Sequence, residues 1–371
     1  MKRTILGWAL VAATVAATTV MPQARSADAV GAVYTATNSV AGNAVRVFNR
    51  TADGALTYVT AVPTGGNGSG NGLGNQGGLA LTNDGKFVLV VNAGSNDLSV
   101  LQTTGDGLSL VDRKNSGGTR PISVSVNGRL VYVLNNGGVA GGMDTVVGFR
   151  LSREGVLTQI PGSARGLSES AVGPAEVAFS ADGGTLVVTE KATNRLDVFE
   201  VNDDGQLGAV NIVPSSGVTP FGFAFGKHDQ FFVSEAFAGA VDASAVSAYQ
   251  LTGGTGISVI SPSVPTTETA ACWVTVTPDG RFLYTTNAGS GSVSGYAIRP
   301  DGAIVLLNAD GVTGVTGGGV ADVTLTNNGR YLYALRSGAG AIAMFRVEEH
   351  GALTPLGNVS LPPGANGIAA R

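Results

Sequence analysis

The sequence predicts an all-β fold, a seven-bladed β-propeller with four antiparallel strands per blade. Two series of turn signals support it, each recurring about every fifty residues. In the first series a polar residue precedes Gly, and in most copies a Leu, Val or Ile follows and opens a short apolar strand. The second series falls between the members of the first, and two hairpins per repeat give four antiparallel strands. The first series is Asp53-Gly54, Asp106-Gly107, Glu154-Gly155, Asp204-Gly205, Asp301-Gly302, His350-Gly351 and a looser copy at 253–256, and the second is Asp84-Gly85, Asn127-Gly128, Asp182-Gly183, Asp279-Gly280 and Asn328-Gly329, with His228-Asp229 in the remaining slot.

The composition agrees with this fold. Charged residues make up only 13% of the chain, and 56 of its 371 residues are Gly. Soluble domains usually contain about 25% charged residues, so the low fraction indicates strands that are covered on both faces. Strand repeats of this length cannot cover their own apolar faces, and radial stacking closes them into a propeller. Although the length alone would suggest two or more domains, the uniform repeat predicts one propeller over residues 30–371.

The strands of each repeat follow in a fixed order. The inner strand alternates apolar with other residues just before a turn of the second series, which is a strand pattern. The inner strands carry Leu79 and Leu81, Ile122 and Val124, Val177 and Phe179, Phe223 and Phe225, Val274 and Val276, and Val323 and Leu325. The second strands are predicted at 86–91, 130–134, 185–189, 230–234, 282–286 and 331–335, and the third strands include 98–101, 146–149, 196–199, 246–249, 293–296 and 342–345.

The two ends of the chain are predicted to close the ring. Segments 31–37, 44–48 and 55–59 supply only three strands, whereas 366–370 has the pattern of an inner strand with no blade after it. We therefore expect these fragments to complete one blade, which makes the last ten residues part of a sheet.

Residues 1–29 are predicted to be a signal peptide. Lys2 and Arg3 precede the uncharged stretch 4–20, and Ala27-Asp28-Ala29 offers the small residues that signal peptidase prefers, with Ala24-Arg25-Ser26 as an alternative cut. The alternative is a membrane anchor, but the stretch is at the short end for a span. We therefore expect a periplasmic or extracellular protein.

Charge and cysteine content narrow the partners. Removing residues 1–26 takes three of the 22 Lys and Arg residues and leaves 19 against 26 Asp and Glu. This acidic balance argues against nucleic acid or anionic membranes as partners and leaves a small molecule or a protein as the expected partner.

Cys272 is the single Cys, so no internal disulfide can form. No His or Cys cluster has metal-ligand spacing, so no metal or other cofactor is expected.

One mouth of the predicted channel carries the longer connections. Functional groups are expected there, because loops from several blades converge. We expect the Gly-rich segment 65–78 to be a mobile loop of this mouth and not a phosphate cradle, since no strand and helix flank it. The longer connections are 64–77, 136–144, 163–173, 236–245, 262–269 and 310–319.

Charged and aromatic residues interrupt the repeat at this mouth. The second strand ends on Asn in four blades, but on Glu190, Glu235 and Arg336 in the other three. The starts of the inner strands add further polar and aromatic groups. These are Glu176, Trp273 and Asp322, with Arg120, Phe221 and Cys272 one position ahead of an inner strand. Each has a structural alternative: the carboxylates can pair with Arg195 or Arg120, Trp273 can pack in the core, and Cys272 can be a small buried apolar residue.

Five further segments share a pattern with known proteins: 186–194, 219–225, 233–237 and 270–274 with 285–289. They resemble the lactonase family of seven-bladed propellers, which includes the propeller type of 6-phosphogluconolactonase and fungal carboxymuconate lactonizing enzymes. The resemblance spans roughly residues 30–371, and the segments are similar to those of secreted bacterial members. It implies that Glu190 matches the second-strand Glu of the family. The family's His after Pro near an inner-strand start has no match, because Ala175 and Glu176 follow Pro174.

The resemblance implies hydrolysis of a small lactone, or a carboxymuconate cyclase-like reaction. In the hydrolysis, Glu190 or Glu235 would deprotonate water, two close carboxylates would raise the pKa of one of them, and Arg120 would stabilise the oxyanion, a role that Arg336 could share. The substrate-binding residues would be Glu176, Arg336, Trp273, Asp322 and Phe221. A phosphorylated sugar lactone is not expected, since it is an intracellular metabolite. The alternative is a non-catalytic extracytoplasmic propeller that binds a sugar, a peptide or a protein partner.

Overall fold

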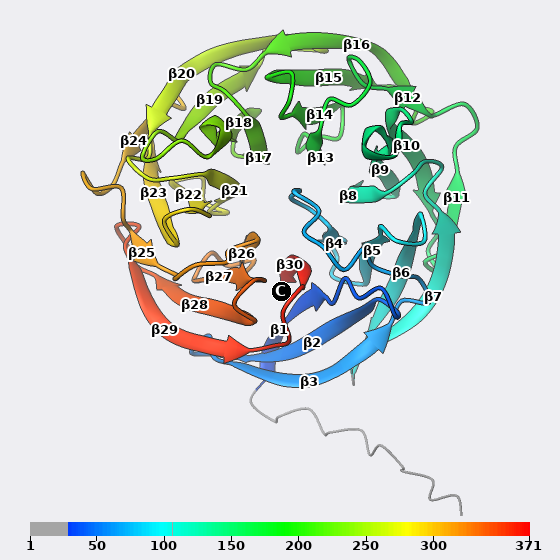
Figure 1. Ribbon diagram of the computed structural model, residues 1–371, viewed down its shortest axis with the longest axis horizontal. Coiled ribbons are helices and arrows are strands. Elements are labelled where there is room, and N and C mark those ends of the chain that lie inside the picture. Colours follow the sequence, from blue (N-terminus) through cyan, green and yellow to red (C-terminus); the bar gives the residue numbers. More distant parts are fainter. Residues whose placement is uncertain (1–28, 106) are drawn as a thin grey trace, which may run out of the picture.

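The computed structural model describes residues 29–105 and 107–371, which form seven antiparallel sheets around a central axis (Figure 1). Each sheet has four strands along its main path, which are consecutive in the chain except in the sheet that joins β30 to β1, β2 and β3, and two sheets carry one further short strand. The only helical elements in this part of the chain are two short 3-10 turns, η1 (Gly137–Ala140) and η2 (Phe237–Gly239). The predicted all-β, seven-bladed propeller is therefore confirmed.

The predicted signal peptide, residues 1–29, lies outside the described residues except for Ala29, with which β1 begins. Asp106 of one predicted turn lies outside them as well. Within the described ranges, no helix has the length and apolar character needed to cross a membrane.

The blades are numbered in chain order, and their strands run from the channel outwards. Blade 1 is β30 (Asn366–Ala370), β1 (Ala29–Ala36), β2 (Ala44–Thr51) and β3 (Leu56–Pro63); blade 2 is β4 (Leu79–Leu81), β5 (Phe87–Asn92), β6 (Asp97–Thr104) and β7 (Gly107–Asn115); blade 3 is β8 (Pro121–Asn127), β9 (Leu130–Asn136), β10 (Asp144–Leu151) and β11 (Leu157–Gln159), with β12 (Arg165–Gly166) beside β10. Blade 4 is β13 (Pro174–Phe179), β14 (Thr185–Glu190), β15 (Arg195–Val201) and β16 (Leu207–Pro214); blade 5 is β17 (Pro220–Phe225), β18 (Gln230–Glu235), β19 (Ala245–Leu251) and β20 (Ile257–Pro265). Blade 6 is β21 (Ala271–Val276), β22 (Phe282–Asn287), β23 (Ser292–Ile298) and β24 (Ile304–Leu306), with β25 (Gly314–Val315) beside β23; blade 7 is β26 (Asp322–Leu325), β27 (Tyr331–Arg336), β28 (Ala341–Val347) and β29 (Leu353–Ser360).

Burial follows the position of a strand in its blade. Every residue of β5 and of β18 is buried, because neighbouring blades cover both faces of a second strand. The outer strand β3 has a mixed pattern with several exposed residues. This gradient explains the low charge content, since a strand buried on both faces has no solvent side on which to place charges.

The glycines of the first turn series allow one blade to dock against the next. Gly54, Gly205 and Gly351 have φ between +77° and +89°, a left-handed conformation that favours Gly. A Cβ on Gly54 would lie 2.3 Å from the Tyr331 ring of blade 7. The carbonyl oxygens of these three glycines accept hydrogen bonds from tyrosines of the preceding blade. Tyr132 Oη donates to Gly205 O at 2.8 Å, Tyr284 Oη to Gly351 O at 2.9 Å and Tyr333 Oη to Gly54 O at 2.8 Å. The turn series therefore fixes the contacts between blades as well as the hairpins.

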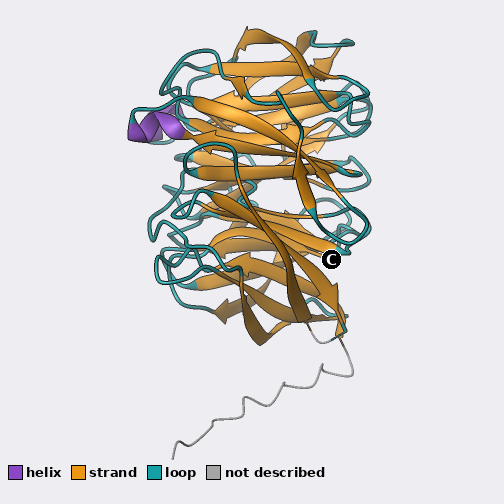
Figure 2. Cartoon of the chain, turned by 90° about the vertical axis from the view of Figure 1, so that its right-hand side faces the viewer, coloured by secondary structure: helices purple, strands orange, loops and turns teal. Residues whose placement is uncertain are grey.

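The two faces of the ring differ. Inner and second strands are joined by the tight turns of the second series at one face, the turn face. The connections that follow second strands, including η1 and η2, lie at the opposite loop face (Figure 2). The predicted division into a plain face and a loop-rich face is therefore present.

The ends of the chain close the ring in blade 1 (Figure 1). β30 pairs with β1, with Ala369 opposite Tyr34. Beyond the strand, Arg371 N donates to Ala32 O at 2.9 Å, and the Arg50 guanidinium donates to Arg371 O. The predicted closure is confirmed.

Deleting residues 362–371 should lower the free energy of unfolding by several kcal/mol, because blade 1 loses its inner strand and the apolar edge of β1 meets water. Thermal unfolding followed by circular dichroism measures this loss. A peptide of the ten deleted residues, added in excess, should raise the midpoint again by binding to the folded state. A truncated protein that melts within about two degrees of the full chain contradicts the closure.

Candidate functional site

A segment of the connection between β3 and β4 fills the channel. We call residues 74–78 the plug. Gln76 lies at its centre and is 9% exposed. Its side-chain amide donates to Val274 O at 2.8 Å and to Phe223 O at 3.4 Å, and its Oε1 accepts from Val274 N at 2.9 Å. Its backbone N donates to Ala175 O at 3.1 Å. One residue thus binds the inner strands of blades 4, 5 and 6.

Asn75 extends the plug to further blades. Its amide donates to Ile122 O in blade 3, and its Oδ1 accepts from Asn366 Nδ2 in blade 1 at 2.9 Å. Its carbonyl accepts from the Trp273 indole N–H at 2.7 Å. The predicted mobile mouth loop is therefore wrong for this part of segment 65–78. Channel-facing backbone groups of the inner strands require partners, and the plug supplies them.

The plug also explains why Gly222 lies at an inner-strand start. A Cβ there would lie 2.0 Å from Gln76 Oε1 and 2.6 Å from Cys272 O. Any side chain at this position would displace the plug.

Glu176 and Asp322 lie buried in the channel, at 6% and 3% exposure. Phe223 N donates to Glu176 Oε2 at 2.6 Å, and Val323 N donates to Asp322 Oδ1 at 2.8 Å. Burial raises the pKa of Asp322 to about 8, and burial, reinforced by the charge of Asp322, raises that of Glu176 well above its usual value. No ion pair in the described ranges involves either residue. These two predicted substrate-binding residues are thus channel residues that favour the protonated form.

Glu190, the predicted base, is fully buried, and hydrogen-bond donors occupy both of its carboxylate oxygens. Ser168 N donates to Oε1 at 3.0 Å, and the hydroxyls of Ser168 and Thr193 donate to Oε2 at 2.6 and 2.5 Å. Asp197 Oδ2 accepts from the same Ser168 N at 2.9 Å. Burial and the adjacent Glu190 raise the pKa of Asp197 to about 8. A close carboxyl pair does form, but the partner of Glu190 is Asp197 in its own blade, a residue that the sequence pattern did not single out.

Glu235 is held in an equivalent way in blade 5. Gly217 N and the Ser247 hydroxyl donate to Oε1 at 2.8 and 2.5 Å, and the Ser263 hydroxyl donates to Oε2 at 2.6 Å. Burial raises the pKa of Glu235, against the opposing effect of these donors. Each Glu therefore ties a connection of the loop face to the end of a second strand.

Hydroxyl and backbone donors hold Glu190 and Glu235, and no Arg does so. No ion pair in the described part of the chain joins either residue to Arg120 or Arg336. The Arg336 side chain instead donates to Gly318 O at 3.3 Å. The reason is local: connections of the loop face and the outer strands of the same blade supply hydroxyl and backbone donors to both carboxylates.

Arg120 is placed differently from these acids. It is partly exposed and adopts φ +55°, and its backbone N donates to Asn96 Oδ1 at 2.7 Å. Its Nε is buried and has no hydrogen-bond partner. A buried donor without a partner is costly.

Lys191 is a neighbour of Arg120 that the sequence pattern did not indicate as a site residue. It follows Glu190 directly, and its Nζ donates to Gly74 O in the plug and to Pro174 O at 2.9 Å. Burial lowers the pKa of Lys191 to about 8, and the nearby charge of Arg120 acts in the same direction, against Cys272 and Asp144. The available signal was its place in segment 186–194, next to the Glu that interrupts the repeat.

Phe221 and Trp273 form an aromatic layer at the loop face. Their rings meet edge to face at 5.3 Å, and Lys191 Nζ lies 4.9 Å from the Phe221 ring centroid. Both rings are more than nine-tenths buried, as is Cys272. Burial raises the pKa of the Cys272 thiol to about 12, which fits a small apolar residue and not a nucleophile. The aromatic layer shields Lys191 from water more than it offers a surface to a ligand.

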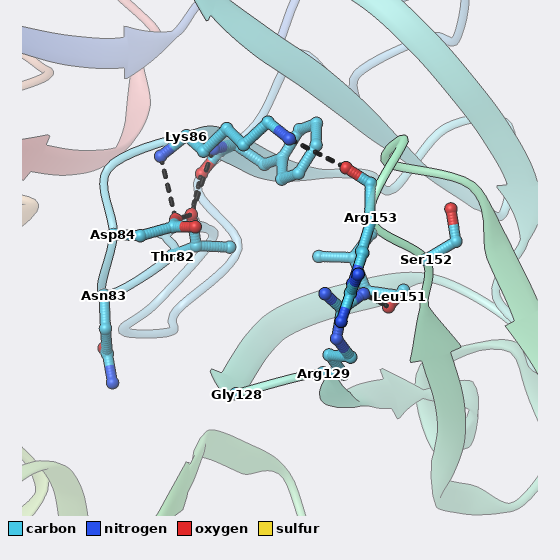
Figure 3. A pocket seen from close by; sticks show the side chains of 10 residues that line it. Thr82, Asn83, Asp84, Lys86, Gly128, Arg129, Leu151, Ser152 and Arg153 are labelled. Atoms are coloured by element: carbon cyan, nitrogen blue, oxygen red, sulfur yellow. Dashed lines mark hydrogen bonds between the residues drawn. The ribbon is translucent and has the colours of Figure 1, made fainter.

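A cavity of about 450 Å³ opens at the turn face between blades 2 and 3 (Figure 3). Its charged groups already bind protein atoms: Asp84 accepts from Thr82 Oγ1 at 2.7 Å and from Lys86 N at 3.0 Å, and Lys86 Nζ donates across the blade boundary to Arg153 O at 2.8 Å. Arg129 donates to Leu151 O. The cavity therefore follows from the repeated turn and contains none of the predicted site residues.

Replacing Asp322 by Asn should flatten the dependence of stability on pH. In the folded protein the Asp322 carboxyl keeps its proton up to about pH 8, whereas in the unfolded chain it loses the proton near pH 4. The contribution of Asp322 to the free energy of unfolding is therefore complete below pH 4 and falls as the pH rises from 4 to 8. The slope per proton is about 1.4 kcal/mol per pH unit. Urea unfolding of both proteins across this range measures it. Equal slopes for Asp322→Asn and the unchanged protein contradict a protonated Asp322.

Replacing Glu190 or Glu235 by Gln should lower the melting temperature and change any turnover by less than about threefold, because each carboxylate anchors a loop and has no oxygen free for water. Thermal unfolding and steady-state kinetics on the same samples test this. A loss of about a hundredfold in kcat without a change in melting temperature would instead identify that residue as the general base.

Comparisons with known proteins agree with this architecture. A family model described as "Lactonase, 7-bladed beta-propeller" matches residues 41–139 and 144–253, which is more than half of the chain. No match was found among curated protein sequences.

Solved structures cover nearly the whole chain at low sequence identity. A candidate 6-phosphogluconolactonase from Bacteroides uniformis has 19% identity and a TM-score of 0.71, covering 92% of this chain and 99% of its own. The periplasmic gluconolactonase of Pseudomonas aeruginosa has 14% identity and a TM-score of 0.71, covering 92% and 98%. A protein from Lactobacillus plantarum gives 17% identity, a TM-score of 0.71, and 92% and 99%. Identities this low establish the common fold, and the family model adds the relationship: the chain belongs to the lactonase family of seven-bladed β-propellers.

Proposed function

We propose that this protein hydrolyses a small lactone at the loop face, beside Arg120 and Lys191. The family and the names of two structural neighbours, a candidate 6-phosphogluconolactonase and a gluconolactonase, support a lactone as the substrate class. Export of the mature protein belongs to the same proposal and rests on residues 1–29 together with the periplasmic neighbour.

The unsatisfied Arg120 carries the proposal. Its Nε is a buried donor without an acceptor, and no acidic side chain in the described ranges forms an ion pair with it. A cation held ready in this way binds a negative oxygen more strongly than a neutral one. In lactone hydrolysis the carbonyl oxygen becomes negative only when water has added to the carbon. Arg120 therefore suits the tetrahedral intermediate better than the substrate.

The proposed steps use water, a base and Arg120. Water adds to the carbonyl carbon as it gives up a proton, and the carbonyl oxygen becomes an oxyanion next to Arg120. Collapse of the intermediate breaks the bond between the carbonyl carbon and the ring oxygen, which takes up a proton. The product is a hydroxy acid, whose carboxyl group releases a proton to solvent near neutral pH.

Changing Arg120 to Gln should lower kcat/KM for the best lactone by about a hundredfold, as expected when one oxyanion donor is lost. The panel should contain five- and six-membered neutral sugar lactones, simple aliphatic lactones and one phosphorylated lactone, each followed by acid release with a pH indicator. Gln has an unbranched polar side chain, as Arg has, so the substitution should cost no more than Arg does at the backbone φ of +55°.

The matched control is Arg299→Gln, since Arg299 is exposed and lies in a turn of the first series. It should retain full activity. No hydrolysis of any lactone by the unmodified protein, together with measurable binding of a glycan or a protein, would replace this proposal by the binding alternative.

A further inference from the structure

We propose that Lys191 is the general base that takes the proton from water in this lactone hydrolysis. The inference rests on the proposed function and assigns the group that the two buried Glu residues do not supply. Lys191 follows the last residue of β14 and is partly exposed at the loop face. The positive charge of Arg120, the proposed oxyanion donor, acts on it. Base and oxyanion donor thus lie on adjacent blades.

The contacts of Nζ fit a neutral amine. An ammonium group has three N–H donors, whereas a neutral amine has two donors and one lone pair. Lys191 has two carbonyl acceptors, Gly74 O and Pro174 O, and no acidic side chain in the described ranges forms an ion pair with it. Loss of one proton therefore leaves both hydrogen bonds in place and frees a lone pair for water.

The surroundings of Nζ also disfavour its charge. Burial of the side chain disfavours the ammonium form, and Arg120 adds a like charge, whereas the face of the Phe221 ring, 4.9 Å from Nζ, attracts the cation. The Asp144 carboxylate acts in the opposite direction, but it accepts from Gly138 N and Val172 N at 2.7 and 2.9 Å and forms no ion pair with Lys191. The thiol of Cys272 stays protonated. The pKa of about 8 for Lys191 follows from burial first and leaves a useful fraction of free base near neutral pH.

The proton balance of the step is closed. Nζ takes a proton from water as the oxygen of that water bonds to the lactone carbonyl carbon. When the bond from this carbon to the ring oxygen breaks, Nζ returns the proton to the departing oxygen. Lys191 ends the cycle as it began it, and lactone and water have become a hydroxy acid.

Lys191 also ties the plug to blade 4, so a purely structural role must be separated from catalysis. Lys191→Arg keeps a cation and donors for the two carbonyls, but Arg does not lose its proton in proteins. Lys191→Met removes both functions. Lys86→Met is the matched control: Lys86 likewise donates to a carbonyl, Arg153 O, and lies over an aromatic ring, Phe87 at 5.1 Å, but it is exposed at the turn face.

The test is kcat/KM as a function of pH, from about 6 to 9.5, together with the melting temperature of each protein. The unmodified protein should gain activity with an apparent pKa near 8. Lys191→Arg should lose about a hundredfold and show no such rise, while it melts within a few degrees of the unmodified protein. Lys86→Met should match the unmodified protein in both measurements.

Two outcomes overturn the inference in distinguishable ways. A Lys191→Arg protein that retains the rate and the pH profile shows that Lys191 only anchors the plug, and lactone hydrolysis as the function stands. An unmodified protein without lactone turnover removes the proposed function itself, and the role of Lys191 with it.

Discussion

The channel is filled by hydrogen bonds between the plug and the inner strands, and the other features of the loop face depend on this interaction. Inner strands leave one row of backbone groups facing the axis, which in an open channel would need water. Gln76 and Asn75 supply donors and acceptors to the inner strands of blades 1, 3, 4, 5 and 6. Because the plug is fixed, Gly74 O is fixed as well, and with it the amine of Lys191. A loop of the same length without these two amides would leave Pro174 O as the remaining carbonyl partner of the lysine.

Burial without counterions sets the electrostatic character of the interior. Glu176, Asp322 and Asp197 have raised pKa values, whereas that of Lys191 is lowered, so in each case the neutral form is favoured. The effects on stability share one direction for the three acids: stability decreases as pH rises toward their native pKa values, because the unfolded chain gives up these protons earlier. The same rise in pH frees the amine of Lys191. The protein should therefore gain catalytic base over a range in which it loses stability.

The repeat made the fold predictable, and the absence of a repeat at the loop face made the site difficult to predict. Turns such as Asp84-Gly85 recur with the same local hydrogen bonds, so a single copy describes the others and the spacing gives the number of blades. The surroundings of Glu190 come instead from Ser168 and Asp197, which belong to a connection and a third strand and not to the repeated turns. The low-complexity composition of segment 65–78 suggested mobility, and only the side chains of Asn75 and Gln76 give it a fixed structure. The sequence marked the loop-rich mouth, but it could not show which ionised groups find partners there.

Arg120 and Lys191 act on each other electrostatically, and neither forms an ion pair with an acidic side chain in the described ranges; this arrangement supports the proposal of catalysis over that of simple binding at the loop face. If the site had evolved to hold a neutral sugar, polar uncharged donors would do so without the mutual repulsion of Arg120 and Lys191. A neutral lactone brings no negative charge in its ground state, so Arg120 gains little from it. Charge appears on the carbonyl oxygen as water adds, at the moment when the base has taken a proton. Stabilisation that is present only at that point lowers the barrier without tightening substrate binding, which is the condition for an increase in kcat.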